Sequence, residues 1–440
     1  MKFNSKDHLP KILFFALTVI FMGYILRWVF PFNIEITLTI ILILSIYVVS
    51  VRGCRMIPKS IFIWILLMTL FWSFNVGISL WHDSDIGVRT LRLINTYSLV
   101  FGFAAVAILI GLIRPSIDYF WYLIAMSSLV LLSAFVYELI HLGMGAITNG
   151  YRFGAITSQS ISFGVVASTF FIILLGSISW AFKKGWVFFL VWIILLIAVL
   201  GMTFLSQTRT AWIGLLSAII IWFFYYGVKM YRADGTAVNK LGLLVISIAI
   251  LSSIFSSSYL EKIVEKRVIL VTSEFNSYIE RKKFNTSVGA RLIMYEALLT
   301  TDDRYFWLGL GTENFPAFLK DGTQRVAAVE FQKEFNGYSF TTIHNQFLMN
   351  WLMHGVFAFL SVLAFFVFMF IHFYKGFRNS AEEHKSIWIA GLAYCIATFI
   401  SFLPESMLHS VYNFSHFFMV SSILVAYTAT LNSKTSKEIN

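Results

Sequence analysis

The hydropathy pattern divides the chain into long apolar stretches separated by short polar segments. Runs without any Asp, Glu, Lys or Arg cover residues 153–182, 185–208 and 241–260. Each is long enough for the roughly 20 residues that an α-helix needs to cross the hydrocarbon core of a bilayer. Windows of about 19 residues predict twelve such helices, near residues 11–30, 35–51, 60–80, 93–113, 117–140, 160–182, 186–206, 210–228, 241–258, 344–374, 386–403 and 410–431. We therefore expect an all-α integral membrane protein.

The polar segments carry an uneven distribution of basic residues that predicts orientation. With the N-terminus inside, the cytoplasmic segments hold seventeen Lys and Arg residues, whereas the short outer segments and helix ends hold five. The five are Arg27, Arg89, Arg92, Arg152 and Arg209. Because cytoplasmic loops are enriched in Lys and Arg, both termini should be cytoplasmic. The first apolar stretch is too long for a signal-peptide core and should remain in the mature protein.

Residues 259–343 interrupt the pattern with one long polar segment. It contains eleven Lys and Arg and eleven Asp and Glu, so it is neutral. We expect three regions: residues 1–258 with the first nine membrane helices, a long periplasmic loop at 259–343, and residues 344–440 with helices ten to twelve and a cytoplasmic C-terminus. A loop of this length should fold onto the bundle. A short helix is predicted at 287–299, with Thr286 or Ser287 as its cap.

Composition supports the membrane assignment and excludes a nucleic-acid partner. Of 440 residues, 58% are hydrophobic and 12% are charged, which is far from soluble averages. The net charge of +11 lies outside the neutral loop, mostly in the cytoplasmic turns. It therefore indicates topology rather than affinity for nucleic acid. The two cysteines, Cys54 and Cys395, provide no disulfide framework.

The predicted spans contain almost no ionisable residues, so any chemistry should lie at a membrane surface. Arg209 stands at the start of a predicted helix, whose free N–H groups favour an anion such as a diphosphate. A guanidinium grips phosphate oxygens through two hydrogen bonds. Alternatively, Arg209 extends to lipid headgroups. Arg291 is a second possible clamp, or it pairs with Glu296 or another acid of the loop.

Three further arginines, Arg89, Arg92 and Arg152, could complete a basic patch on the outer side, although headgroup contact would explain each equally well. His344 stands near the N-terminus of the tenth predicted helix, where a neutral ring able to accept a proton suits a general base. The alternative is an interfacial histidine that bonds a carbonyl group. His354, further along the same helix, is expected to be a packed intramembrane histidine.

Two other motifs have simpler explanations. Asp83 and Asp85 could share a divalent cation, with Glu405 completing the coordination, but such pairs arise easily in polar turns. Gly309 and Gly311 could cradle a phosphate, but they lack a preceding strand and a following Lys, so a plain turn is favoured. We expect no metal site and no cofactor.

Taken together, these segments resemble the O-antigen ligase family. The resemblance rests on Ser-Gln-Thr-Arg-Thr-Ala at 206–211, Thr-Ser-Val-Gly-Ala-Arg-Leu-Ile-Met-Tyr-Glu at 286–296, Gly-Leu-Gly at 309–311, and His-Asn at 344–345 with Gly355 downstream. The layout of twelve helices with a long loop before the tenth extends it over most of the chain. Enterobacterial lipopolysaccharide O-antigen ligases are the most similar type.

The resemblance implies a GT-C-like fold and metal-independent glycosyl transfer. The donor would be O-antigen on undecaprenyl diphosphate and the acceptor a sugar hydroxyl of the lipid A–core oligosaccharide, at the periplasmic face of a bacterial inner membrane. Arg209 and Arg291 would hold the diphosphate, and His344 would be the catalytic histidine. Arg89, Arg92, Arg152 and Asn345 are further candidates for binding diphosphate or glycan. Membrane lipids would be the remaining partners.

Two rival functions stay open on the sequence. An O-antigen polymerase would use the same donor but a second lipid-linked glycan as acceptor. A transporter of lipid-linked sugars would be expected to show inverted repeats, broken helices or charges near the middle of the membrane. None of these is evident in the sequence.

Overall fold

The computed structural model describes residues 34–53, 57–82, 86–155, 159–232, 240, 269–280, 286–299, 305–326 and 342–438. These parts of the chain are helical and contain no β-strand. The named helices are α2 (Ile34–Arg52), α3 (Lys59–His82), α4 (Val88–Ile113), α5 (Ile117–Leu142), α6 (Gly145–Thr148), α7 (Ser160–Leu174), η3 (Leu175–Ser177), α8 (Ile178–Lys184), α9 (Trp186–Leu205), α10 (Arg209–Tyr231), α13 (Ser287–Leu299), α14 (Tyr305–Leu308), α15 (Phe315–Val326), α17 (Gln346–Asn379), η5 (Glu382–His384), α18 (Lys385–Phe402), η6 (Met407–His409) and α19 (Val411–Glu438).

Nine helical segments among the described residues are long and apolar enough to cross a membrane, which confirms a multi-pass all-α protein. α7, η3 and α8 together form one of these segments, Ser160–Lys184. The observed helices extend beyond the predicted windows. For example, α4 begins at Val88, whereas the hydropathy window begins at residue 93, because Arg89 and Arg92 in the first turns of this helix are polar. The predicted spans at 11–30 and 241–258 lie outside the described residues, as do Asp83 and Asp85.

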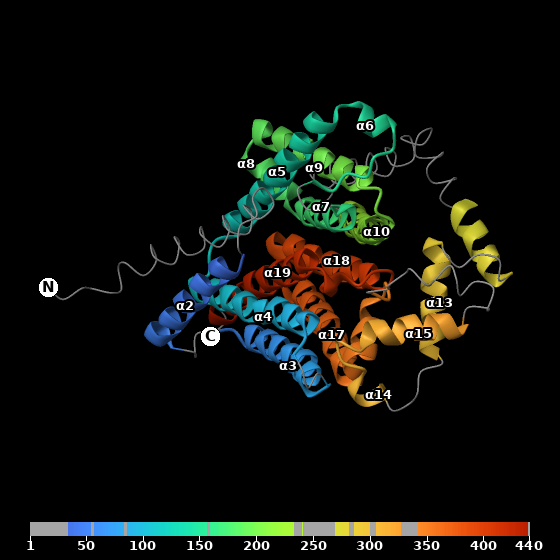
Figure 1. Cartoon of the computed structure of the whole chain (residues 1–440). Coiled ribbons are helices and arrows are strands. Elements are labelled where there is room, and N and C mark those ends of the chain that lie inside the picture. Colours follow the sequence, from blue (N-terminus) through green and yellow to red (C-terminus); the bar gives the residue numbers. More distant parts are fainter. Residues whose placement is uncertain are drawn as a thin grey trace.

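The helices form two groups on either side of α18 and α19 (Figure 1). α2, α3, α4 and α17 lie on one side, and α5, α7, α9 and α10 lie on the other. Helix α18 contacts both α17 and α10, and it approaches α10 closely because Gly214 has no side chain: a Cβ there would lie 3.1 Å from the carbonyl oxygen of Ala397. Small residues at crossings allow close helix packing in membranes.

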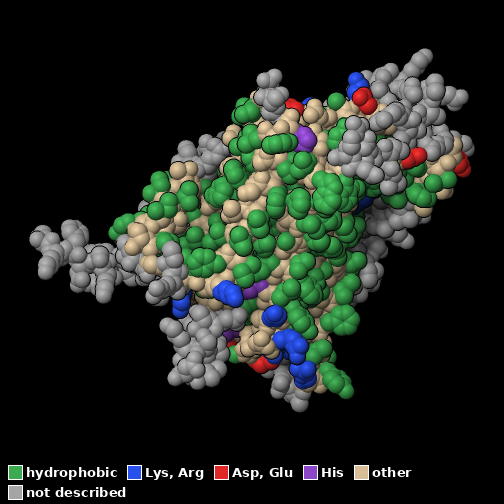
Figure 2. Space-filling model, turned by 90° about the horizontal axis from the view of Figure 1, so that it is seen from below, with side chains coloured by type: hydrophobic (Ala, Val, Ile, Leu, Met, Phe, Trp, Pro, Cys, Tyr) green, Lys and Arg blue, Asp and Glu red, His purple; other side chains and the backbone are tan. Residues whose placement is uncertain are grey.

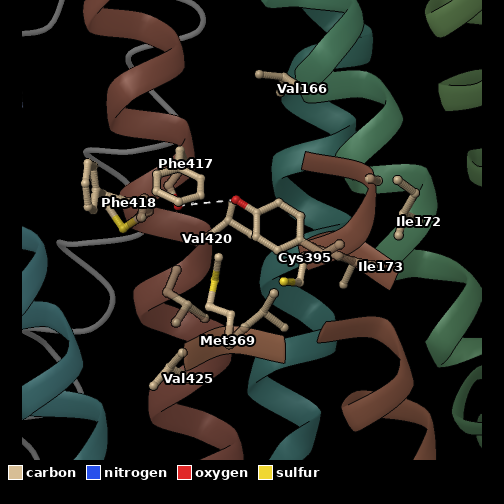
Figure 3. Close-up of a cluster of buried hydrophobic side chains, with 14 of the residues drawn as sticks. Val166, Ile172, Ile173, Met369, Cys395, Phe417, Phe418, Val420 and Val425 are labelled. Atoms are coloured by element: carbon tan, nitrogen blue, oxygen red, sulfur yellow. Dashed lines mark hydrogen bonds between the residues drawn. The ribbon is translucent and has the colours of Figure 1, made fainter. Parts of the chain in front are cut away.

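The interior is mostly apolar, and several of its buried polar groups are hydrogen-bonded. Figure 3 shows Met369 of α17, Cys395 of α18 and Phe417 of α19 packed together in this interior. Tyr226 of α10 donates a hydrogen bond to the carbonyl of Leu175, at 2.9 Å, where η3 interrupts the regular helix. Such pairing is needed because a bilayer offers no water to buried carbonyl groups. Hydrophobic side chains also cover the middle of the face seen in Figure 2, with charged side chains toward its rims.

Helix α17 is broken at Gly355, where φ is 76° and ψ is −174°. The break leaves the carbonyls of Leu352 and Met353 without intrahelical donors, and the amides of Leu310 and Gly311 bind them, each at 2.9 Å. A Cβ on Gly355 would lie 1.9 Å from the carbonyl oxygen of Trp307, so only glycine fits. The Gly-Leu-Gly segment is therefore a turn that docks the connection between α14 and α15 onto α17, and the amides of Leu310 and Gly311 are not available to a phosphate.

Candidate functional site

Four of the residues predicted from sequence line one cavity of about 430 Å³. The cavity lies where the beginning of α10, helix α13, the residues just before α17 and the segment after α18 meet. Its lining consists of Arg152, Ile161, Gln207, Thr208, Arg209, Thr210, Ile213, Ala290, Arg291, Met294, His344, Pro404 and Glu405. Three guanidinium groups, one imidazole and one carboxylate thus share a single space.

A polar turn between α9 and α10 fixes Arg209. Thr208 donates a hydrogen bond to the carbonyl of Ser160 at 2.8 Å, and the Gln207 side chain donates to the carbonyl of Gly150 at 3.0 Å. Gln207 itself has φ of 50°, which turns the chain sharply before the helix. Arg209 is then the first residue of α10, half-buried at the positive end of the helix. The Gln-Thr-Arg motif therefore joins three segments and sets the direction of one arginine.

The same turn helps to hold the segment that carries Arg152. Gln207 binds this segment at Gly150, and Glu138 of α5 accepts a hydrogen bond from the amide of Ala155 at 2.7 Å. Arg152 itself is exposed at the rim of the cavity. Its position suits contact with a ligand that enters from outside the bundle.

Helix α13 carries Arg291 into the cavity from the long loop. Thr286 caps the helix, since its hydroxyl accepts a hydrogen bond from the amide of Gly289 at 2.9 Å, as one of the two predicted caps should. Glu296 binds the hydroxyl of Tyr278 rather than Arg291. The acid that faces Arg291 is Glu405, whose Oε2 lies 3.9 Å from Nη2 of the guanidinium.

His344 lies two residues before α17, with φ of 55°. Its Nδ1 is 3.0 Å from Oε1 of Glu405, so this carboxylate contacts both the histidine and Arg291. Only 11% of the Glu405 side chain is exposed, and 35% of the His344 side chain is. The hydroxyl of Tyr295 donates to the carbonyl of His344 at 3.3 Å, and burial raises the pKa of this tyrosine. His344 is therefore held by its backbone and by one ring nitrogen.

Arg89 and Arg92 lie elsewhere, in a smaller cavity of about 110 Å³. It is also lined by His409, and burial, followed by the charges of Arg92 and Arg89, lowers the pKa of that ring. Glu313 positions this region, because its carboxylate accepts a hydrogen bond from the amide of Thr90 at 2.9 Å. The chain segment 404–409 contributes to the linings of both cavities.

Two other residues named from the sequence, Asn345 and His354, make contacts within the fold and do not line this cavity. Asn345 caps α17 through a hydrogen bond from the amide of Leu348 to its side-chain oxygen, at 3.0 Å, and it does not line the cavity. His354 is buried at the break in α17, with its Nε2 2.9 Å from the hydroxyl of Ser79, which confirms a packed histidine.

Among the described residues, no group of three or more His, Cys, Asp or Glu side chains is arranged to hold a metal ion. Asp83 and Asp85 are not among those residues. The sequence indicates Glu405 only as a possible metal ligand and does not predict its contact with His344. The available signal was an acid directly after an apolar span, at the same end of the bundle as the three arginines.

Comparisons with known proteins agree with the motifs. The family model described as O-antigen ligase matches residues 194–363. An uncharacterised protein of Haemophilus influenzae is 26% identical over 220 residues, which cover 50% of this chain and 52% of that protein. The match therefore spans about half the length of this relative. The matched residues 194–363 include Arg209, Arg291 and His344, so this part of the chain is similar to the O-antigen ligase family.

Proposed function

We propose that this protein is an O-antigen ligase, a glycosyltransferase of the bacterial inner membrane. It transfers O-antigen polysaccharide from undecaprenyl diphosphate to the lipid A–core oligosaccharide at the periplasmic face. The observation that carries the proposal is the single cavity shared by Arg152, Arg209, Arg291 and His344. In this proposal residues 1–258 and 344–440 form the membrane part, both termini are cytoplasmic, and residues 259–343 form the periplasmic loop.

The arginines bind and stabilise the leaving group. A lipid diphosphate carries its charge at the membrane surface, where the cavity opens beside the start of α10. Guanidinium groups from Arg209 and Arg291 bind its oxygens, and Arg152 at the rim adds a third positive charge. Their fixed charges stabilise the negative charge that develops on the diphosphate as the glycosidic bond breaks. This electrostatic stabilisation makes a metal ion unnecessary.

His344 activates the nucleophile, which is the acceptor hydroxyl. Its Nδ1 is bound to Glu405, so Nε2 is the ring nitrogen that accepts the proton of the acceptor hydroxyl. The hydroxyl oxygen attacks the anomeric carbon on the side opposite the diphosphate, the bond from that carbon to the phosphate oxygen breaks, and the diphosphate leaves with the electron pair. The configuration at the anomeric carbon is inverted. Glu405 stabilises the imidazolium formed in this step.

The cavity with Arg89 and Arg92 serves the acceptor. The segment 404–409 contributes residues to the linings of both cavities, and in this proposal a glycan in the smaller cavity extends toward His344. Its two guanidinium groups suit phosphate or carboxylate groups on the acceptor oligosaccharide. Asn345, which caps α17, contributes to binding by holding His344 in place rather than by direct contact.

A deletion strain tests the function. Loss of an O-antigen ligase leaves a bare lipid A–core band on a lipopolysaccharide gel and causes lipid-linked polymer to accumulate. Core capped by a single repeat would instead identify a polymerase that uses the same donor. A transporter would move lipid-linked sugar in proteoliposomes without forming a glycosidic bond.

The three functional residues are tested with purified protein. His344→Ala should remove most turnover and leave donor binding intact, whereas Arg209→Gln and Arg291→Gln should weaken donor binding as well. Turnover near normal in His344→Ala would contradict the role of His344.

A further inference from the structure

A third cavity, of about 590 Å³, lies at the end of the bundle away from the Arg209–His344 cavity. α10 and α17 begin beside the Arg209–His344 cavity and end at this third cavity, and α18 begins there. We call it the distal cavity. Its lining is Ile221, Phe224, Tyr225, Val228, Lys229, Arg232, Phe377, Arg378, Glu382, Lys385 and Ile389. None of these residues takes part in the proposed glycosyl transfer.

The distal cavity is strongly basic. Among the described residues that line it, four side chains are cationic, those of Lys229, Arg232, Arg378 and Lys385, and one is a carboxylate, that of Glu382. Glu382 binds both lysines: its carboxylate forms an ion pair with Lys385 and lies 3.8 Å from Nζ of Lys229. The lining therefore keeps a net charge of three positive units, in a space large enough for a headgroup.

Aromatic rings help to hold the two lysines. Nζ of Lys229 lies 4.7 Å from the centre of the Tyr225 ring, and Nζ of Lys385 lies 5.8 Å from the centre of the Phe377 ring. Cation–π contacts of this kind favour one position of a flexible side chain. The two arginines, by contrast, are exposed at the mouth of the cavity, beside the ends of α10 and α17.

One wall of the distal cavity is apolar and faces outward. Phe224 is 66% exposed and Val228 is 48% exposed, and both lie on α10 a turn or two before Arg232. A free inorganic anion would make no use of this wall. A ligand with a charged head and a hydrocarbon chain would use the basic mouth and the apolar wall together.

We propose that the distal cavity binds an anionic phospholipid, with the headgroup phosphate among Arg232, Arg378, Lys229 and Lys385 and an acyl chain along Phe224 and Val228. Basic pockets between membrane helices bind anionic lipid headgroups by the same combination of charge and apolar contact. A general bias of basic residues toward the cytoplasmic side accounts for charge at helix ends. It accounts neither for a cavity between three helices nor for an exposed apolar wall beside it.

Native mass spectrometry of the purified full-length protein tests this proposal. The protein is titrated with phosphatidylglycerol, with phosphatidylcholine of the same acyl chains, and with inorganic phosphate. We expect retention of phosphatidylglycerol that weakens between low and high salt, and little retention of the other two. Equal retention of phosphatidylcholine would overturn the proposal, because charge would not matter. Equal occupancy by inorganic phosphate would overturn it too, because the acyl chain would not matter.

A pair of variants locates the lipid. Arg232→Gln with Arg378→Gln should weaken phosphatidylglycerol binding on the order of 30-fold, since each basic residue near the headgroups contributes substantially. The matched control is Lys183→Gln with Lys375→Gln, which removes two exposed cations at the same end of the bundle but outside the cavity. Equal losses in the two double variants would show that only net charge matters and would refute the site. The wild-type titration stands independently of how either variant folds.

Discussion

Replacing Glu405 by Gln should slow glycosyl transfer by acting through His344. The substitution keeps the size of the side chain and removes its charge. Glu405 lies 3.0 Å from Nδ1 of His344 and is only 11% exposed, so water does not take the place of the lost carboxylate charge. Its absence leaves the imidazolium formed during the reaction without its counter-charge.

The size of the effect follows from these contacts. A hydrogen bond to a charged partner contributes about 1.5–3 kcal/mol, equivalent to about 10- to 150-fold in rate. Because the His344 side chain is 35% exposed, solvent stabilises part of the imidazolium charge, and we expect the lower part of this range, about 10- to 30-fold. Donor binding should change little, since Glu405 faces Arg291 at the longer distance of 3.9 Å.

The assay is a double-mutant cycle on the rate of polysaccharide transfer by purified protein. His344→Ala alone should lose about 10²- to 10⁴-fold, as expected for a general base. If Glu405 acts through His344, the double variant should be no slower than His344→Ala. Glu296→Gln is a matched control, because this acid lies on α13 outside the cavity and binds Tyr278. Independent, multiplicative losses in the double variant would refute the reasoning, as would a normal rate in Glu405→Gln.

Four other predictions concern different parts of the molecule. Gly355→Ala should destabilise the protein by about 3 kcal/mol or more, because it combines a backbone conformation reserved for glycine with a clash 1.9 Å from a carbonyl oxygen; thermal unfolding in detergent measures this. Arg89→Gln with Arg92→Gln should raise the KM for the acceptor and leave donor affinity unchanged in steady-state kinetics. Excess chelator should leave transfer unaffected in the same assay. The lowered pKa of His409 should make the stability of the fold acid-sensitive. In the unfolded chain this ring binds a proton below about pH 6.5, whereas in the folded protein it stays neutral. The free energy of unfolding should therefore fall from pH 7 to pH 5, and it should fall less steeply in His409→Gln.

A specific result would contradict each of these four predictions. Gly201→Ala is the control for the glycine, because a Cβ on this α9 residue meets no atom within 4 Å, and equal losses in the two variants would disprove the special role of Gly355. A weaker donor affinity in the Arg89→Gln, Arg92→Gln double variant would show that their cavity also binds the donor. Loss of transfer that Mg²⁺ or another divalent ion restores would require a metal. If the stability of His409→Gln depends on pH as that of the wild type does, His409 does not cause the acid sensitivity.

The sequence predicted the nine long apolar helices found among the described residues, because the hydrocarbon core imposes the same length and apolar character on every crossing helix. It could also predict Arg209, Arg291 and His344 as one group, since each lies in a local motif. It could not predict that Glu405 meets His344, because this contact joins residues 61 positions apart across two helices. For the same reason it could not separate Arg89 and Arg92 from Arg152, which carry the same charge on the same side.

The position of Glu405 along the chain also determines when the site can form during synthesis. Arg209 enters the membrane with α10, and Arg291 and His344 follow, but the carboxylate that holds the histidine is made only after α18. A nascent chain released from the ribosome before residue 405 carries all three candidate substrate-contacting side chains and has no assembled site. In the proposed function, translation through α18 to residue 405 is thus the step that completes the cavity, and termination before this residue leaves the cavity without its carboxylate.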